Sequence, residues 1–279
     1  MLVSAILRFR ALESFSLPGN GGEEAHGLLF SLLREAVPSV SERWHELKGP
    51  KPFSLSGVRG EGLRREGGRL HVPEGGEIWL RLSTLTDEGA EALALLSDLL
   101  LSGEAEPRLG EGRLEPLGVD LGGGSELALS STYSSLLRRA RPHKAVSMRF
   151  VSPTAFRRGG VNYPLPDPRA VFSSLLWRWN AFSPIKMPPE IAGDFERAAL
   201  ARFRLRTELL EFGGFREVGF LGEVRFDLSR LPPDERRLLH ALSLFAFFSG
   251  VGRHTAMGMG EVAPPPELAS PSGPGEGSR

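Results

Sequence analysis

The segment RLLHALSLFAFFSGVGRHTAMGMGEVAP, residues 237–264, decides how this chain folds, because an apolar run passes directly into closely spaced glycines. The apolar run, with two prolines ahead of it, predicts a helix over residues 232–250. The final MGMGEVAP predicts a strand over residues 257–264. The glycines between them predict a tight connection whose backbone can approach a phosphate or a base closely. A dinucleotide-binding loop is excluded, because G-x-G-x-x-G must follow a strand and open a helix.

The region before this segment supplies the rest of one repeating unit. The sequence predicts a strand at 145–154, a helix at 167–182 and a short extra helix at 189–201. Two further strands, 202–212 and 215–229, form a predicted hairpin that turns at Gly213–Gly214. With the last helix and strand, the order is βαββαβ.

The first half of the chain predicts the same order. Strands are expected at 2–13, 52–58, 77–85 and 112–121, and helices at 22–38 and 86–103. Pro38 marks the end of the first helix, and Thr86 and Gly103 are the expected caps of the second. We therefore predict an α+β chain of tandem ferredoxin-like, RRM-like βαββαβ domains with a C-terminal glycine-rich loop. The expected domains are 1–121 and 126–264, separated by GGGS, and 265–279 is an expected disordered tail.

Composition narrows the class of protein. The chain has 279 residues, of which 41% are hydrophobic and 24% charged, as in an ordinary globular protein. There is no cysteine, which excludes disulfides, thiolate nucleophiles and cysteine zinc sites. No apolar run reaches the ~20 residues that span a bilayer, and the N-terminus is expected to be a strand. We therefore expect a cytoplasmic protein without a membrane partner.

Charge is distributed unevenly although the formal net charge is zero. Residues 127–166 contain no Asp or Glu but seven basic residues: Arg138, Arg139, Arg141, Lys144, Arg149, Arg157 and Arg158. Such a block is suited to a phosphate backbone. A solvated basic face is the alternative that the sequence leaves open.

The glycine segment also carries a family resemblance. Gly250-Val251-Gly252, five residues that include a basic one, and Gly258-Met259-Gly260 resemble the signature of CRISPR-associated endoribonucleases that process pre-crRNA. These enzymes belong to the superfamily of repeat-associated mysterious proteins. VSPTAFRRGG (151–160), LPDPRAVFSSLLWRW (165–179) and WHELKGPKPFSLS (44–56) are similar to other family segments. The resemblance implies two ferredoxin-like domains, binding of CRISPR repeat RNA and cleavage of pre-crRNA without a metal or other cofactor.

Metal-free cleavage uses the adjacent 2′-OH as nucleophile and leaves a 2′,3′-cyclic phosphate and a 5′-OH. The protein must remove one proton, supply another and stabilise charge on the phosphate. The resemblance assigns His45 as a catalytic histidine and Lys51 as the lysine that supports the phosphate. Some family members use a tyrosine in the first helix, but Phe30 stands there and has no exchangeable proton. His26, on the first turn of that helix, is the candidate replacement, and packing on the sheet is its alternative.

The expected RNA-binding residues are Gly250, Gly252, Arg253, His254, Gly258, Gly260, Arg138, Arg139, Arg141, Lys144, Arg157 and Arg158. Of the remaining histidines, we expect His71 to be structural, His143 to touch phosphate and His240 to pack within its helix.

Three competing functions remain to be weighed. The first is a non-catalytic RNA-binding subunit of a CRISPR effector complex. The second, a general RNA-recognition module, lacks the aromatic strand motif that such modules carry. The third, a metal nuclease, lacks residues at ligand spacing in the sequence. Beyond CRISPR repeat RNA, an effector complex and a second copy of the chain are candidate partners.

Overall fold

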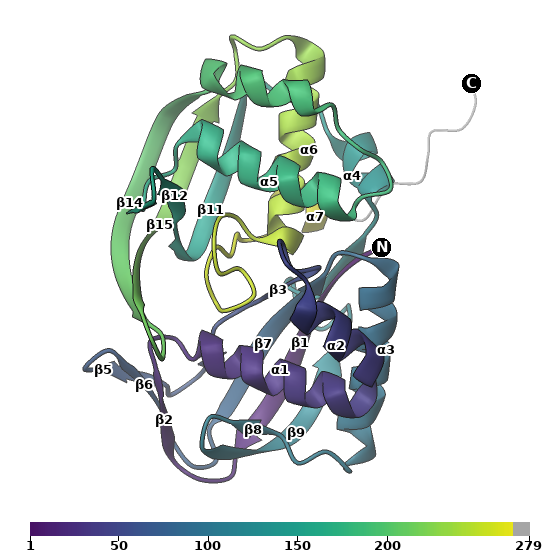
Figure 1. Ribbon diagram of the computed structural model, residues 1–279, viewed down its shortest axis with the longest axis vertical. Coiled ribbons are helices and arrows are strands. Elements are labelled where there is room, and N and C mark those ends of the chain that lie inside the picture. The colour runs from purple at the N-terminus through teal and green to yellow at the C-terminus, as the bar shows by residue number, and fades with distance from the viewer. Residues whose placement is uncertain (270–279) are drawn as a thin grey trace.

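Two lobes are stacked along the long axis of the molecule in the computed structural model, which describes residues 1–269 (Figure 1). The first half of the chain forms one lobe and the second half forms the other. The segment that comes after α6 lies between the two lobes, beside β3 and the start of α1 (Figure 1).

The first lobe is built on an antiparallel sheet in the order β3-β7-β1-β9-β8. Its strands are β1 (Leu2–Ala11), β3 (Phe53–Leu55), β7 (Glu77–Thr84), β8 (Arg108–Leu109) and β9 (Gly112–Asp120). The order β3-β7-β1-β9 is that of a ferredoxin-like unit, in which the first and third strands lie at the centre. Helices α1 (Gly22–Ala36), α2 (Pro38–Glu46) and α3 (Asp87–Ser102) belong to this lobe.

Shorter strands extend the first lobe beyond the predicted unit. A second sheet has the order β2-β6-β5, formed by β2 (Phe15–Pro18), β5 (Arg64–Glu66) and β6 (Arg69–Val72). β4 (Arg59–Gly60) pairs with β7, and β10 (Leu129–Ser131) pairs with β1. Periodic patterns did not locate these strands, because each is too short to show one.

The predicted caps of the second helix are confirmed. The Thr86 side chain accepts a hydrogen bond from the Gly89 backbone N–H at 3.0 Å, and Gly103 ends α3 with φ of 76°. The end of the first helix differs from the prediction, since a further helix begins there. Pro38 does stop α1, but it also opens α2, because proline is well suited to the first position of a helix.

The second lobe has the sheet order β11-β15-β14, from β11 (Ala145–Thr154), β14 (Ala199–Glu211) and β15 (Arg216–Asp227). Helices α4 (Tyr133–Arg139), α5 (Pro168–Phe182) and α6 (Pro233–Ser249) accompany it, with the hairpin β12 (Phe156–Arg158) and β13 (Val161–Tyr163). The predicted extra helix at 189–201 is a 3₁₀-helix, η1 (Pro189–Arg197), and β14 already begins at Ala199.

The predicted last strand at 257–264 is wrong in extent. Only one isolated β-bridge joins Val262 to Phe150 of β11, flanked by backbone hydrogen bonds at Glu261 and Ala263. Gly258 and Gly260 have positive φ angles, which interrupt an extended strand, and prolines at 264–266 lack the N–H donors that would continue it. The fourth strand position of the second sheet is therefore filled by a single bridge.

Each lobe has its own hydrophobic core, and a few residues cross between the two. Leu2 and Leu85, from the first half, lie in the core of the second lobe, whereas Ala256 lies in the core of the first. The exact domain boundaries stay a prediction. Within the expected tail, Pro266–Ala269 forms the short helix α7, with Leu268 against the second core, and residues 270–279 lie outside the described residues. Among residues 1–269, no helix is long and apolar enough to cross a membrane.

Candidate active site and RNA-binding surfaces

Two of the predicted catalytic residues are brought together by Phe30. The His26 ring on α1 lies with its centroid 4.7 Å from that of Phe30, and the His45 ring centroid lies 5.7 Å from that of Phe30. His26 is half-buried, whereas His45, on the last turn of α2, is exposed. Phe30 itself is buried and carries no titratable group, so it is an apolar contact shared by the two imidazoles.

Lys51 lies at the C-terminal end of α2 and uses its ammonium group to bind backbone. Its Nζ donates to the carbonyl oxygens of Trp44 at 2.6 Å, His45 at 3.1 Å and Leu47 at 3.1 Å. A cation is well placed at this negative end of a helix. Partial burial lowers the pKa of Lys51 below its usual range. Lys51 therefore holds in place the helical turn that carries His45.

The tautomer of neutral His26 follows from one hydrogen bond. Its Nδ1 lies 3.0 Å from the carbonyl oxygen of Ala256, 230 residues away in the chain. A carbonyl oxygen only accepts hydrogen bonds, so Nδ1 carries the proton and the neutral ring leaves a lone pair on Nε2. Burial, assisted by the positive charges of Lys51 and His45, lowers the pKa of His26. A neutral imidazole with a free Nε2 is the form that a general base requires.

The glycine segment at 250–260 packs against the first lobe. The Leu55 N–H donates to the Thr255 carbonyl at 2.8 Å, and the Gly258 N–H donates to the Leu55 carbonyl at 3.0 Å. The Asn20 side-chain amide donates to the Gly258 carbonyl at 2.9 Å. The segment therefore joins the second lobe to β3 and to the start of α1, directly beside His26.

Backbone conformation and contacts within the protein itself explain why these four residues are glycines. All have positive φ, between 66° and 82°, and all except Gly252 are buried. A Cβ on Gly258 would lie 2.8 Å from the Asn20 amide nitrogen, and one on Gly260 would lie 2.1 Å from the Val251 carbonyl oxygen. The close backbone contacts that these glycines permit are therefore made with other parts of the protein. A contact between these glycines and RNA stays a prediction.

The two other predicted binding residues of this segment face a buried carboxylate. Arg253 Nη1 lies 3.0 Å and 3.2 Å from the two carboxylate oxygens of Glu217. His254 Nε2 lies 3.8 Å from Glu217, and its ring packs beside Phe212 and Phe215. Burial, followed by the charge of Arg253, lowers the pKa of His254. Any phosphate at Arg253 has to compete with Glu217 for the guanidinium.

The predicted basic residues of the second lobe lie in two groups. The first contains Arg138 and Arg139 on α4 and Arg141 and Lys144 on the loop that leads into β11. Arg141 donates to the carbonyls of Arg138 and Ala140, and Arg139 donates to the Glu267 carbonyl. The second group is Arg157 and Arg158 on β12, where Arg158 lies over the Tyr163 ring and 3.8 Å from Asp167.

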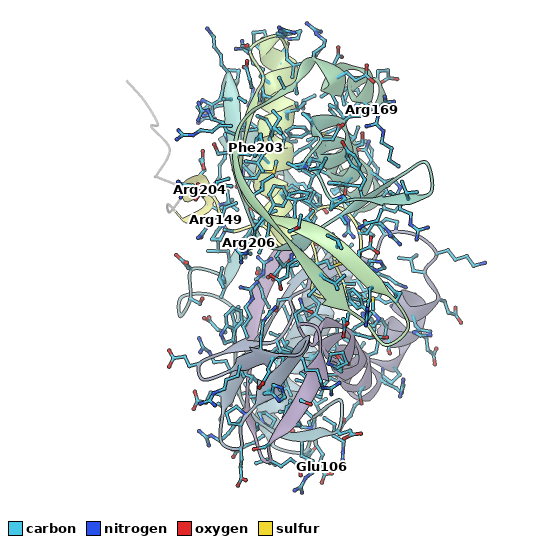
Figure 2. The ribbon with its side chains drawn as sticks, turned by 90° about the vertical axis from the view of Figure 1, so that its left-hand side faces the viewer. Glu106, Arg149, Arg169, Phe203, Arg204 and Arg206 are labelled. Carbon is cyan, nitrogen blue, oxygen red and sulfur yellow. The ribbon has the colours of Figure 1, made fainter. Side chains whose placement is uncertain are left out.

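A further basic surface was missed from the sequence. The segment RFRLR, residues 202–206, lies within β14, and side chains two residues apart point to the same face of a strand. Figure 2 shows Arg149, Arg204 and Arg206 near one another on this side of the second lobe. Arg202 and Arg225 are paired across the sheet, and Phe203 is 60% exposed. We call Arg149, Arg202, Arg204, Arg206 and Arg225 the arginine face; the alternation R-x-R-x-R was the signal that could have revealed it.

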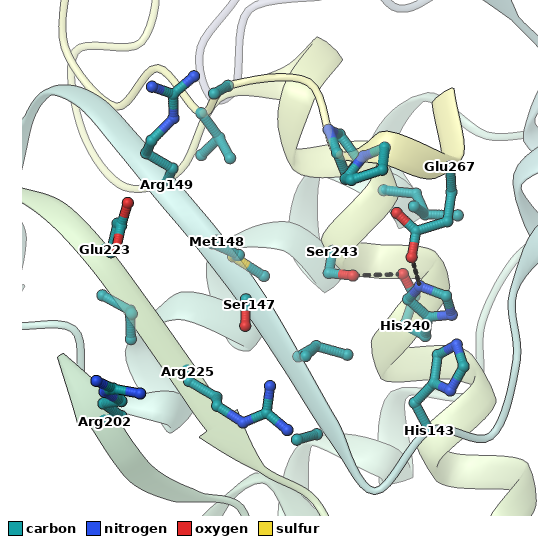
Figure 3. A pocket seen from close by; sticks show the side chains of 18 of the residues that line it. His143, Ser147, Met148, Arg149, Arg202, Glu223, Arg225, His240, Ser243 and Glu267 are labelled. Atoms are coloured by element: carbon teal, nitrogen blue, oxygen red, sulfur yellow. Dashed lines mark hydrogen bonds and ion pairs between the residues drawn. The ribbon is translucent and has the colours of Figure 1, made fainter. Parts of the chain in front are cut away.

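A groove of about 890 Å³ lies between this sheet and the segment after Val262 (Figure 3). Three possible metal ligands meet at its end, where atoms of His143, His240 and Glu267 lie within 4.8 Å of one another. Spacing in the sequence did not reveal this cluster, because its three residues lie far apart along the chain. His240 Nδ1 accepts the Arg141 N–H at 2.9 Å, so Nε2 carries the proton and faces Glu267 at 3.5 Å. With both nitrogens engaged, His240 serves as a buried hydrogen-bonding residue, as its helix position predicted.

Solved structures with similar sequences show the family. A product complex of one Cas6 is 32% identical, covers 94% of this chain and 98% of that chain, and has a TM-score of 0.73. This chain belongs to the Cas6 family of CRISPR-associated endoribonucleases. The product complex of a second Cas6, from Thermus thermophilus, is 31% identical with a TM-score of 0.78 and covers 95% of this chain and 100% of that chain. These likenesses confirm the tandem ferredoxin-like fold of the Cas6 family for this chain.

Two comparisons by sequence agree with the family. The family model for the CRISPR-associated endoribonuclease Cas6 matches residues 148–262. A CRISPR-associated endoribonuclease Cas6 of Mycobacterium tuberculosis is 33% identical over 126 residues. That match covers 44% of this chain and 40% of the relative, so the chain is aligned with less than half of the length of this Cas6.

Proposed function

We propose that this Cas6 family member binds CRISPR repeat RNA and cleaves pre-crRNA within the repeat without a metal ion. The observation that carries the proposal is the pair of histidines, one half-buried with a free Nε2 and one exposed, whose rings both pack against Phe30. Product complexes of the two similar Cas6 proteins support RNA cleavage as the activity.

In the proposed reaction His26 is the general base. Its Nε2 takes the proton of the 2′-OH, and the 2′-oxygen then attacks the adjacent phosphorus. The pKa of His26 is lowered by burial, which keeps the ring neutral near neutral pH. The Nδ1–H bond to the Ala256 carbonyl orients the ring during the transfer.

His45 is the general acid in this proposal. Its exposed ring at the end of α2 can reach the leaving 5′-oxygen and give it a proton as the P–O bond breaks. Lys51, which holds the turn of His45, contributes a positive charge beside the phosphate. The products are a 2′,3′-cyclic phosphate and a 5′-OH.

RNA binding is proposed for the second lobe. The predicted residues Arg138, Arg139, Arg141, Lys144, Arg157 and Arg158 supply positive charge, and the arginine face adds a strip of guanidinium groups on the open side of the sheet. Such a strip suits a phosphate backbone. The exposed Phe203 ring, which alternates with these arginines along the edge strand β14, offers a stacking surface for a base. In this proposal a cytoplasmic effector complex receives the product, and a second copy of the chain is a candidate partner.

The experiment that tests the activity uses a labelled CRISPR repeat RNA in EDTA, beside the same RNA with a 2′-deoxy nucleotide at the scissile position. Cleavage that persists in EDTA and stops with the 2′-deoxy RNA is the expected result. Cleavage lost in EDTA would overturn the metal-independent mechanism. Tight binding without cleavage would instead favour the non-catalytic subunit of an effector complex.

The residues are tested by three single variants. We expect His26→Ala and His45→Ala each to lower the single-turnover rate by about 10²–10⁴-fold, the usual range for a lost acid or base. His71→Ala is the matched control, because His71 is an exposed histidine on β6, in the smaller sheet. A His45→Ala protein that cleaves at the normal rate would remove His45 from the mechanism.

A further inference from the structure

The carbonyl that orients His26 belongs to the glycine segment, and this segment is held from behind by a buried arginine. Arg178 on α5 is 5% exposed. Its Nη1 donates to the Ser249 carbonyl at 3.1 Å, and its Nη2 donates to the Thr255 hydroxyl oxygen. Arg178 therefore binds the residue directly before the segment and the residue next to Ala256.

The position of Arg178 is costly for the fold. Among the described residues no carboxylate forms an ion pair with it, and its Nε has no hydrogen-bond partner. Burial lowers the pKa of Arg178 to about 10. A buried cation without a counter-charge reduces stability unless its hydrogen bonds do something that an apolar side chain cannot. Its two acceptors are Ser249, directly before the glycine segment, and Thr255 within it.

Thr255 connects this arginine to the catalytic site. Its side chain is 1% exposed and accepts from Arg178, while its own carbonyl accepts from the Leu55 N–H of β3. The next carbonyl along the chain, that of Ala256, accepts from His26 Nδ1. Two consecutive residues are thus held in place. Thr255 is held by Arg178 and by β3, and the Ala256 carbonyl is held by its hydrogen bond with the His26 imidazole.

Asn20 holds the segment from the other side. Its amide nitrogen donates to the Gly258 carbonyl, and its Oδ1 accepts from the Gly22 N–H at 3.0 Å, at the first residue of α1. The helix that carries His26 and the segment that orients it therefore share one anchor. Asn20 thereby helps to fix the distance between His26, on the helix, and the Ala256 carbonyl, on the segment.

We propose that Arg178 and Thr255 are positioning residues that fix the tautomer and orientation of His26 through the Ala256 carbonyl. The glycine segment is, in this role, an internal part of the catalytic site. The proposal rests on the proposed function of His26 as the base. Loss of the Thr255 hydroxyl releases the Ala256 carbonyl, and the proton of neutral His26 is then free to move to Nε2, which removes the lone pair that the reaction uses.

The test compares Thr255→Val, which keeps the shape but removes the hydroxyl, with Thr255→Ser, which keeps the hydroxyl. The tautomer of His26 is measured by nitrogen NMR in protein labelled at histidine, assigned with His26→Ala. Wild type and Thr255→Ser are expected to carry the proton on Nδ1, whereas Thr255→Val is expected to show a mixture. The single-turnover rate of Thr255→Val is expected to fall about 10–100-fold, as for other residues that orient a catalytic group, with little change in RNA affinity.

Two outcomes would overturn the proposal: a proton on Nε2 in the wild-type protein, or a slow Thr255→Val variant whose His26 tautomer is unchanged. If Thr255→Val does not fold, the same two measurements, the His26 tautomer and the single-turnover rate, are made on Thr255→Ala. The tautomer of the wild-type protein tests the proposal in either case. The NMR measurement needs no RNA. A wild-type protein that fails to cleave would therefore count against the proposed function, whereas the His26 tautomer would still test the role of Thr255.

Discussion

Phe30 shows how a single residue changes the chemistry available at this site. The family resemblance implies a tyrosine at this position in some members, but here the ring is apolar and buried, with His26 and His45 both packed against it. The proton transfers must then be divided between the two imidazoles. Their environments differ, since His26 is half-buried and bonded to backbone, whereas His45 is exposed.

The first prediction concerns the pH dependence of cleavage. His26 acts as a base only when neutral, and its pKa is lowered from 6.5 by burial and by Lys51 and His45, against the opposing effects of the Ala256 carbonyl and Glu23. On the acidic side of the pH profile, the cleavage rate should therefore rise with pH through an apparent pKa below 6.5 and then level off. Single-turnover rates between pH 4.5 and 8 on a log scale would show this limb.

A neighbouring charge provides the check on this assignment. Removing the positive charge in Lys51→Met favours the protonated form of His26, so the acidic limb should move to higher pH. Lys48→Met is the control, because Lys48 is exposed in the same loop. If the limb stays where it is in Lys51→Met, the group that titrates is not His26.

At the scale of the element, the glycine segment depends on close backbone contacts. Gly258 has φ of 82° and lies against Asn20 and Gly57, and its N–H and carbonyl both bind the first lobe. No other residue type fits both requirements, since any Cβ would meet an amide that is itself hydrogen-bonded.

We predict that Gly258→Ala destabilises the protein by about 2–4 kcal/mol, from the left-handed backbone and the forced contact together. Urea unfolding measures the change. Gly214→Ala is the matched control, because Gly214 lies in the turn between β14 and β15 with no atom within 4 Å of an added Cβ. Equal stability of the two variants would show that the segment is less tightly held than described.

In β14, the alternation of side chains along the strand places arginines on one face of the sheet. Arg202, Arg204 and Arg206 alternate with Phe203 and Leu205, so the guanidinium groups gather on one side of the sheet (Figure 2). Of these, Arg204 lies opposite Glu223 and Arg206 opposite Leu221 in the pairing with β15.

We predict that the double variant Arg204→Ala, Arg206→Ala weakens RNA binding and makes it less dependent on salt. Each phosphate contact contributes about 0.7 to the slope of log K against log salt for a single strand, so two lost contacts lower the slope by about 1.4. Filter binding at several salt concentrations measures the slope. Arg108→Ala, Arg230→Ala is a control with the same change in charge; an equal loss of slope there would mean that the arginine face has no special role.

At the scale of the whole molecule, the two lobes share a buried ion cluster. Glu261, directly after the glycine segment, pairs with Arg59 and with Arg81 of β7, the latter at 3.2 Å. Arg81 is 2% exposed, donates to the Phe247 carbonyl at 3.1 Å and lies over the Phe247 ring. Burial lowers the pKa of Arg81, and Glu261 opposes that shift.

We predict that Glu261→Gln costs about 3–5 kcal/mol of stability, because it leaves a buried guanidinium without its counter-charge. In calorimetry the wild type should unfold in one transition, and the variant should unfold at a lower temperature. Glu223→Gln is the control, because Glu223 is an exposed carboxylate on β15. Two separate transitions in the wild type would show that the cluster does not couple the lobes.

The sequence by itself determined the order of the main elements. Period-2 and helical patterns in long segments located β1, β7, β11, β15, α3, α5 and α6 within a few residues, because periodicity depends only on which face is buried. The glycine pattern at 250–260 pointed to the family, and with it to His45 and Lys51.

Only the tertiary structure decided what these residues touch. The His26 contact to Ala256 spans 230 residues, and no local pattern predicts which carbonyl an imidazole meets. The last strand was lost because the glycine segment turns to bind the first lobe before it can pair along β11. Likewise, the sequence predicts Lys51 and Arg253 as phosphate ligands, and only the fold shows that Lys51 also binds a helix end and that Arg253 also binds Glu217. A charged side chain takes the partners that folding brings within reach, and these partners come from distant parts of the chain.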